Sequence, residues 1–153
     1  MSAMSAYRNR HLLLLTENAA LAQHIEQALA GYQLSHHLHQ FCDIDHYQEA
    51  ALGSGVIADP MARIDLCLIA YLNDSERTRK AVEEIRLLPR WRSVPLVVLI
   101  EGDNPALARI LYQFGANSVL RFPLRFDGLR ELIRTMDTYW FDVVTLPPPS
   151  MHP

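Results

Sequence analysis

The stretch RIDLCLIAYLNDSERTRK, residues 63–80, decides the fold. Its apolar run over residues 64–72 is typical of a β-strand that is buried on both faces of a parallel sheet. Asp74 or Ser75 can then cap a following helix. A buried strand that leads directly into a helix predicts a βα unit of an open α/β sheet. Ligands usually bind at the carboxyl ends of such strands, and the residue at this end is Ala70.

The alternation of strand and helix continues in both directions along the chain. Strands are predicted over residues 11–15, 34–41, 64–72, 95–100 and 118–122. A short helix is predicted over residues 43–53. Four longer helices are predicted from apolar residues that recur at helical spacing and form one stripe on each helix: Leu21, Ile25, Ala28 and Leu29; Val82, Ile85 and Leu88; Leu107, Ile110, Leu111 and Phe114; and Phe126, Leu129, Ile133 and Met136. This rhythm predicts a doubly wound, five-stranded parallel sheet in three αβα layers.

Local signals place several element boundaries. Asn104 and Pro105 are typical of an N-cap followed by the first helical residue. Gly31 and Gly115 lie where helices are expected to end, since glycine favours the position after a helix. Residues 34–41 are more polar than the other strands, which predicts a position at the edge of the sheet.

Length and composition indicate one globular domain. The chain has 153 residues, of which 50% are hydrophobic and 20% charged. We expect a loose lead over residues 1–10, one domain over 11–141 and a proline-rich tail over 142–153. A net charge of −3 without a long charge run argues against nucleic-acid or membrane partners. The apolar runs are too short to span a bilayer or to serve as a signal peptide. Cys42 and Cys67 form no disulfide framework, so a cytoplasmic location is expected.

Several strand–loop junctions match one known family. They are LLLLTENA (12–19), RIDLCLIAYLN (63–73), VLIEG (98–102) and GANSVLRFP (115–123), followed by Tyr139-Trp140 and three prolines at 147–149. Over about residues 11–141 the chain resembles the receiver domain of bacterial two-component response regulators. The resemblance is closest to small stand-alone receivers associated with phytochrome-type histidine kinases. It implies a CheY-like, flavodoxin-like fold and a role in phosphorelay signal transduction.

The resemblance also implies a phosphorylation pocket, which this sequence does not preserve. A receiver accepts a phosphoryl group on an aspartate at the end of its third strand, beside Mg²⁺ held by acidic residues after the first strand. A hydroxyl after the fourth strand and a lysine before the fifth-strand proline complete the site. These positions fall on Ala70, on Thr16 and Glu17, on Ile100 and on Phe122. We therefore expect a degenerate pseudo-receiver with apolar residues in the old pocket, without catalytic residues, metal or cofactor, that is not an enzyme.

Two acidic residues near this pocket leave alternatives open. Glu17 could be a remaining metal ligand, but we expect a solvated acid in the first turn of a helix, where the helix dipole favours it. Asp74 could be an unconventional phosphoacceptor, although a helix cap is the simpler interpretation.

One cluster carries residue types that bind metals. It comprises His36, His37, His39, Cys42, Asp43, Asp45 and His46. In a strand, His37 and His39 share one face and can hold a metal loosely, but the spacing matches no closed zinc pattern. An edge strand that uses polar side chains to discourage pairing is the simpler interpretation. The alternative is a metal-binding or small-molecule-binding domain with its site in this cluster.

Partner contacts are expected at two surfaces. The first is the face on which receivers commonly bind their partners, where we place Leu111, Tyr112 and Arg121. The second is the aromatic segment Tyr139, Trp140 and Phe141, which follows the last helix. Exposed apolar groups of this kind usually mark an interface. The expected partners are a histidine kinase or another two-component signalling protein, and a second copy of the chain in a homodimer with Trp140 near its centre.

Overall fold

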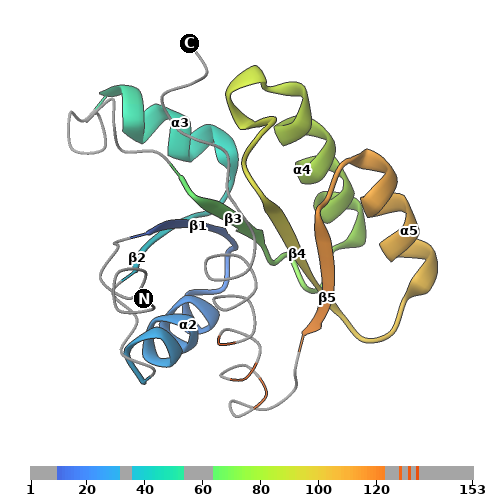
Figure 1. Ribbon diagram of the computed structural model, residues 1–153, viewed down its shortest axis with the longest axis horizontal. Helices are drawn as coiled ribbons and strands as arrows, with labels where there is room; N and C mark the ends of the chain where they lie inside the picture. Colours follow the sequence, from blue (N-terminus) through green and yellow to red (C-terminus); the bar gives the residue numbers. More distant parts are fainter. Residues whose placement is uncertain are drawn as a thin grey trace, which may run out of the picture.

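The computed structural model describes residues 10–31, 36–53 and 64–122, together with positions 128, 131 and 134. Strands and helices alternate along these residues (Figure 1). In chain order they are β1 (His11–Leu15), α2 (Ala19–Gly31), β2 (His37–Phe41), α3 (Ile44–Gly53), β3 (Leu66–Ile69), α4 (Ser75–Leu87), the 3-10 turn η1 (Pro89–Trp91), β4 (Leu96–Glu101), α5 (Pro105–Phe114) and β5 (Ser118–Phe122).

The strands form one parallel sheet in the order β2-β1-β3-β4-β5. The predicted α/β class and the five-stranded parallel sheet are therefore confirmed, and β2 lies at an edge as its polar sequence predicted. The chain winds outward from β1 to β2 and then returns to β3 on the other side of β1. The carboxyl ends of β1 and β3 thus meet where the winding direction reverses, which is the usual position of a ligand site in such sheets.

Two hydrophobic cores lie on the two faces of the sheet. Leu12 and Leu14 pack toward α2 on one face, while Leu13 and Leu15 pack toward α3, α4 and α5 on the other (Figure 1). Successive side chains of a strand point to opposite faces. The unbroken leucine run of β1 therefore supplies both cores at once, as expected for a parallel strand between two helical layers.

Helix ends follow the predicted capping residues. The Asp74 carboxylate accepts a hydrogen bond from the Arg77 amide at 3.0 Å and caps α4, and Asn104 caps α5 in the same way. Gly115 ends α5 with a φ of 116°, in the left-handed region that favours glycine. α4 ends at Leu87, so Leu88 is its C-cap, and the Leu88 side chain still packs on the same core as Val82 and Ile85, as predicted.

Some predictions fall outside the described residues. They concern the last amphipathic helix with its stripe Phe126, Leu129, Ile133 and Met136, the lead over residues 1–9, the loop over 54–63 and the tail over 142–153. The domain boundaries therefore stay predictions. Among the described helices, none combines the length and the hydrophobicity that a transmembrane span requires.

Candidate functional site

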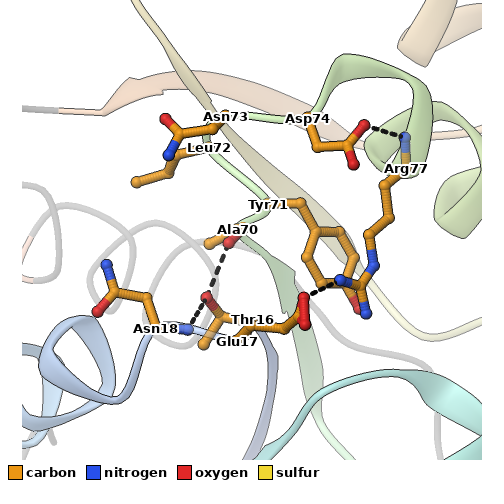
Figure 2. A pocket seen from close by; sticks show the side chains of 9 residues that line it. All are labelled: Thr16, Glu17, Asn18, Ala70, Tyr71, Leu72, Asn73, Asp74 and Arg77. Atoms are coloured by element: carbon orange, nitrogen blue, oxygen red, sulfur yellow. Dashed lines mark hydrogen bonds and ion pairs between the residues drawn. The ribbon is translucent and has the colours of Figure 1, made fainter.

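A pocket of about 280 Å³ opens where β1 and β3 end (Figure 2). It is lined by Thr16, Glu17, Asn18, Ala70, Tyr71, Leu72, Asn73, Asp74 and Arg77. The residues after β1 and those after β3 face each other here because the two strands run parallel and in register. The N-terminal turn of α4 contributes Arg77 and closes one side.

Thr16 joins the ends of the two strands. Its buried hydroxyl donates to the carbonyl oxygen of Ala70 at 2.8 Å and accepts from the Asn18 amide at 3.1 Å. The Asn18 side chain in turn accepts from the Leu21 amide at 3.1 Å, within the first turn of α2. The Thr16 hydroxyl therefore holds the edge of the sheet together and is already engaged on both its donor and acceptor sides.

Arg77 carries the positive charge among the residues that line the pocket. Its guanidinium forms an ion pair with Glu17 and donates to the carbonyl oxygen of Cys42 at 3.1 Å. The guanidinium carbon lies 4.2 Å from the centre of the Tyr71 ring, a cation–π distance. The Tyr71 hydroxyl donates to the same Cys42 carbonyl. One side chain thus connects the residues that follow β1, β2 and β3. Figure 2 shows Arg77 between Glu17 and Tyr71.

The protonation states in this group are well defined. Partial burial alone would lower the pKa of Arg77, but the hydrogen bond to Glu17, the Glu17 charge and nearby Tyr71 and Asp43 raise it. Burial raises the pKa of the Tyr71 hydroxyl well above its ordinary value. Arg77 is therefore a cation and Tyr71 a neutral donor throughout the physiological range.

Two of the five expected pocket positions lie elsewhere. Ile100 is buried in the core under α4 and α5, and Phe122 packs against the core under α2. Thr16, Glu17 and Ala70 do line the pocket. The expected filling by apolar side chains therefore applies to the ends of β4 and β5, whereas the pocket between β1 and β3 has a mixed polar and apolar lining that includes charged side chains of both signs.

The position and the partner of Glu17 differ from the expected solvated acid in the first turn of a helix. It lies before α2, which begins at Ala19, and it pairs with Arg77 rather than only with solvent. Sequence reasoning missed Arg77 and Tyr71. A signal was present, because Arg77 lies in the first turn of the helix after β3 and must therefore lie near the carboxyl edge of the sheet.

The described residues at this edge do not fit the magnesium ion that the receiver resemblance implies. Magnesium prefers several oxygen ligands, with carboxylates among them. Glu17 is neutralised by Arg77, the Asp74 carboxylate caps α4, and the Ala70 side chain carries no oxygen. A guanidinium beside the remaining carboxylate would also repel a divalent cation.

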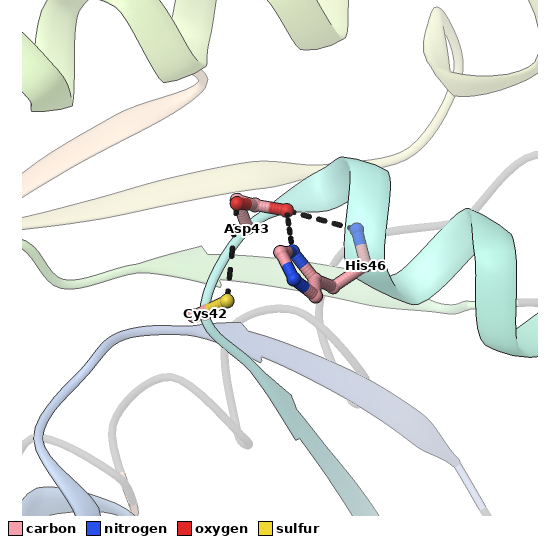
Figure 3. A group of neighbouring side chains, drawn as sticks. All are labelled: Cys42, Asp43 and His46. Atoms are coloured by element: carbon pink, nitrogen blue, oxygen red, sulfur yellow. Dashed lines mark hydrogen bonds and ion pairs between the residues drawn. The ribbon is translucent and has the colours of Figure 1, made fainter.

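The histidine-rich stretch divides into two groups. Cys42, Asp43 and His46 bring one sulfur, one carboxylate and one imidazole within 4.8 Å of one another at the start of α3 (Figure 3). The Asp43 carboxylate accepts from the His46 amide at 2.8 Å and contacts the His46 ring at 2.7 Å. These contacts raise the pKa of His46. They also lower that of Asp43, against the opposing effect of its slight burial.

The second group lies at the amino half of β1 and β2. His37 and His39 occupy one face of β2, as the sequence predicted, and His11 of β1 lies beside both. His36 precedes β2, and Asp45 is an exposed residue of α3. The seven residues of the stretch therefore do not form a single cluster.

The expected interface residues have different environments. Tyr112 is 50% exposed and Arg121 is exposed, so both can contact a partner. Leu111 is fully buried in the core under α5, and its place in an interface was wrong because α5 turns it inward. Tyr139, Trp140 and Phe141 lie outside the described residues.

Comparison with known proteins gives structural similarity alone. No family model matches the sequence, and no curated protein matches it. Among solved structures, the phosphorylated cyanobacterial phytochrome response regulator RcpA is 23% identical, with a TM-score of 0.76 over 92% of this chain and 100% of that chain. The Mn²⁺-bound form of response regulator Rcp1 is 21% identical, with a TM-score of 0.73 over 91% and 99% of the two chains.

A third similar structure is a response regulator in red light signalling of R. palustris. It is 20% identical, with a TM-score of 0.76, and the match covers 91% of this chain and 99% of that chain. At these identities the similarity establishes the fold. The chain has the CheY-like fold of response regulator receiver domains, and the expected resemblance is confirmed at that level.

Proposed function

We propose that this protein is a single-domain receiver-like component of two-component signal transduction that acts without being phosphorylated. It works through protein–protein contacts and is not an enzyme. The observation that carries this proposal is the pocket at the ends of β1 and β3, where Ala70 occupies the phosphoacceptor position and Arg77 pairs with Glu17. The receiver fold supports the signalling role.

Phosphoryl transfer to a receiver requires a carboxylate nucleophile, and the methyl group of Ala70 offers none. The other polar side chains of the pocket already have structural partners. The Thr16 hydroxyl bonds to the Ala70 carbonyl, and Glu17 pairs with Arg77. A phosphoryl group at this edge would lack both a nucleophile and a divalent ion to neutralise its charge.

Arg77 takes over the electrostatic task of a bound cation. In receivers the positive charge at this edge comes from a metal ion, and Rcp1 has been solved with Mn²⁺ bound. Here the guanidinium supplies a fixed positive charge to Glu17 and the Cys42 carbonyl and packs on Tyr71. Because this cation is covalently part of α4, the edge is held in one arrangement that does not depend on metal or phosphate.

An unconventional acceptor at Asp74 is the main rival. Asp74 is exposed at the rim of the pocket, but its carboxylate accepts from the Arg77 amide at 3.0 Å and caps α4. Phosphorylation would have to break that cap and place a dianion close to the Glu76 carboxylate. Its geometry therefore favours a structural role over a chemical one.

The partner is a histidine kinase or a true response regulator of a two-component pathway, in the cytoplasm. Tyr112 on α5 and Arg121 on β5 are the exposed described residues that we assign to the contact surface. A homodimer through Tyr139, Trp140 and Phe141 is a further part of this proposal. Light scattering at micromolar protein checks it: we expect a dimeric mass that becomes monomeric in Trp140→Ala, and a monomeric native protein would contradict it.

The experiment for the signalling mechanism is phosphorylation with acetyl phosphate and Mg²⁺, followed by intact mass measurement. We expect no added phosphoryl group on the native chain, with an active receiver as the positive control. A stable adduct would overturn the proposal. If that adduct vanished in Asp74→Asn, the rival acceptor would be identified.

A further inference from the structure

Three imidazoles gather where β1 and β2 begin. His11 is the first residue of β1 and pairs in register with His37 of β2, while Leu13 pairs with His39. Side chains two residues apart in a strand lie on the same face. The three histidines therefore share one face of the sheet, the face that also carries Leu13 and α3.

The rings contact one another closely. The His11 ring centre lies 4.9 Å from that of His37 and 5.2 Å from that of His39, and both pairs of planes are within 16° of parallel. The Nδ1 atom of His11 is 3.0 Å from the Nε2 atom of His39. Two rigid neighbouring strands thus hold two imidazole nitrogens together with a third ring directly beside them.

A carboxylate lies beside the cluster and positions the start of β1. The acidic group near the cluster is Asp65, whose Oδ2 accepts from the His11 backbone amide at 2.8 Å. Neutral imidazole is the form that binds transition metals.

We propose that His11, His37 and His39 form a binding site for a late first-row divalent cation, with Cu²⁺ bound most tightly. Metal–nitrogen bonds are about 2.0–2.1 Å, so two ligands at right angles lie about 2.9 Å apart and tetrahedral ligands about 3.4 Å apart. His11 Nδ1 and His39 Nε2 are 3.0 Å apart, which is within this range, so one ion can bind both nitrogens with little movement of the two strands. Among such ions, Cu²⁺ binds most strongly in the general order of affinities.

Binding requires a small local rearrangement. The ring that donates the His11 Nδ1–His39 Nε2 hydrogen bond changes tautomer, so its proton moves to the other ring nitrogen, and both rings stay neutral and turn a lone pair to the ion. His37 is exposed at the edge of the sheet, so its ring can rotate to supply the third nitrogen, and the ion can enter from that side. Water completes the coordination.

The Cys42, Asp43 and His46 group is the competing location. The contacts within this group have a structural role at the start of α3, because the Asp43 carboxylate accepts from the His46 amide and contacts the His46 ring. The group lies at the carboxyl end of β2, whereas the three histidines begin at its amino end. Substitutions in the two places therefore separate the alternatives.

The test is calorimetric titration of the untagged full chain with Cu²⁺, Ni²⁺ and Zn²⁺ at pH 7.5, with electron paramagnetic resonance of the copper form. We expect one ion per chain, nitrogen hyperfine coupling, and Cu²⁺ bound more tightly than Ni²⁺ and Zn²⁺. His37→Gln and His39→Gln should each weaken binding at least about tenfold, and His11→Gln likewise. His46→Gln and Cys42→Ser are the matched controls and should leave it unchanged.

Three results would overturn the proposal. One is the absence of stoichiometric binding, and another is binding that survives all three histidine substitutions. The third is binding that is lost in His46→Gln or Cys42→Ser but kept in His37→Gln. Thermal unfolding of each variant without metal checks that it folds. Because His37 is exposed, His37→Gln should leave the fold intact, so weaker binding in this variant reflects the loss of a ligand rather than unfolding. The proposed signalling role does not depend on the outcome.

Discussion

Arg77, in the first turn of α4, forms an ion pair with Glu17, which follows β1, across 60 residues of sequence. The pair occupies the edge of the sheet where the receiver resemblance implies a metal ion and a phosphorylated aspartate. Two further contacts, a hydrogen bond to the Cys42 carbonyl and a cation–π contact with the Tyr71 ring, fix the guanidinium in place. We propose that the Arg77 guanidinium takes the place of a bound metal ion at this edge.

Arg77→Ala should destabilise the protein. An exposed ion pair contributes about 0.2–1 kcal/mol, a cation–π contact about 0.5–1 kcal/mol, and the hydrogen bond to Cys42 adds to both. We expect a loss of about 1–2 kcal/mol in the free energy of unfolding in urea. Arg79→Ala removes surface ion pairs with Glu76 and Glu83 and a longer contact, 5.8 Å, with the Phe114 ring, but, among the described residues, no hydrogen bond to a backbone carbonyl, so it should cost less, about 1 kcal/mol or below. Equal losses in the two variants would contradict the role assigned to Arg77.

Gly115 should tolerate a side chain less well than Gly102. Both have positive φ, 116° and 74°, so alanine carries a backbone cost of about 1–2 kcal/mol at each. A Cβ atom at Gly115 would also lie 2.7 Å from Cγ of Arg86, whereas one at Gly102 would meet nothing within 4 Å. Arg86 cannot easily move, because its guanidinium donates to carbonyls of Trp91 and Val94.

We therefore expect Gly115→Ala to lower the free energy of unfolding by at least about 2 kcal/mol and Gly102→Ala by about 1 kcal/mol. Urea unfolding of the two variants side by side measures the difference. Finding Gly102→Ala to be the more damaging change would mean that Arg86 yields to the new methyl group.

Acid should weaken the fold partly through His39. Burial and the neighbouring His11 and His37 rings lower the pKa of His39 in the folded protein. As the pH falls, the His39 ring is therefore protonated in the unfolded chain, near pH 6.5, before it is protonated in the folded protein. The unfolded state then holds more protons, and stability falls as the pH drops through about 6.5 toward the lower folded value. His46, whose pKa is raised by Asp43, has the opposite sign: its contribution is present at low pH and is lost as the pH rises.

Urea unfolding at pH 7.5 and 5.5, with a chelator present, checks this prediction. The loss of stability between the two pH values should be smaller in His39→Asn than in the native protein. A loss of the same size in both would show that His39 is not responsible.

The two cysteines should react very differently with thiol reagents. Cys67 is fully buried in β3, and burial raises the pKa of its thiol to about 12, so it has almost no thiolate at neutral pH. Cys42 is half-buried at the end of β2. We expect iodoacetamide to add one label to the native chain, none to native Cys42→Ser, and two after unfolding. Labelling of native Cys42→Ser would contradict the placement of Cys67.

The sheet and most helix boundaries could be predicted because their causes are local. The leucine run of β1 and the apolar run before Asn73 indicate strands that are buried on both faces. Asp74 and Asn104 cap helices by accepting hydrogen bonds from backbone amides three residues further along the chain. Leu88 packs on the core as its spacing predicted, although the backbone leaves α4 at that residue.

The site could be predicted only in part, because its contacts are tertiary. The receiver resemblance predicted that Ala70, Thr16 and Glu17 lie at one edge of the sheet, and all three line the pocket there. The Arg77–Glu17 pair depends on how α4 packs against β3, and the position of His11 beside His39 depends on the register of β1 and β2. Neither relation is encoded in the spacing of residues along the chain.

The most direct test of the central claim is a Mg²⁺ titration followed by the backbone amide resonances of Thr16, Glu17 and Asn18. With Arg77 as the resident cation, we expect no saturable shift at millimolar Mg²⁺ in the native protein. Saturable shifts at these amides that disappear in Glu17→Gln would show a functioning magnesium site and contradict the account.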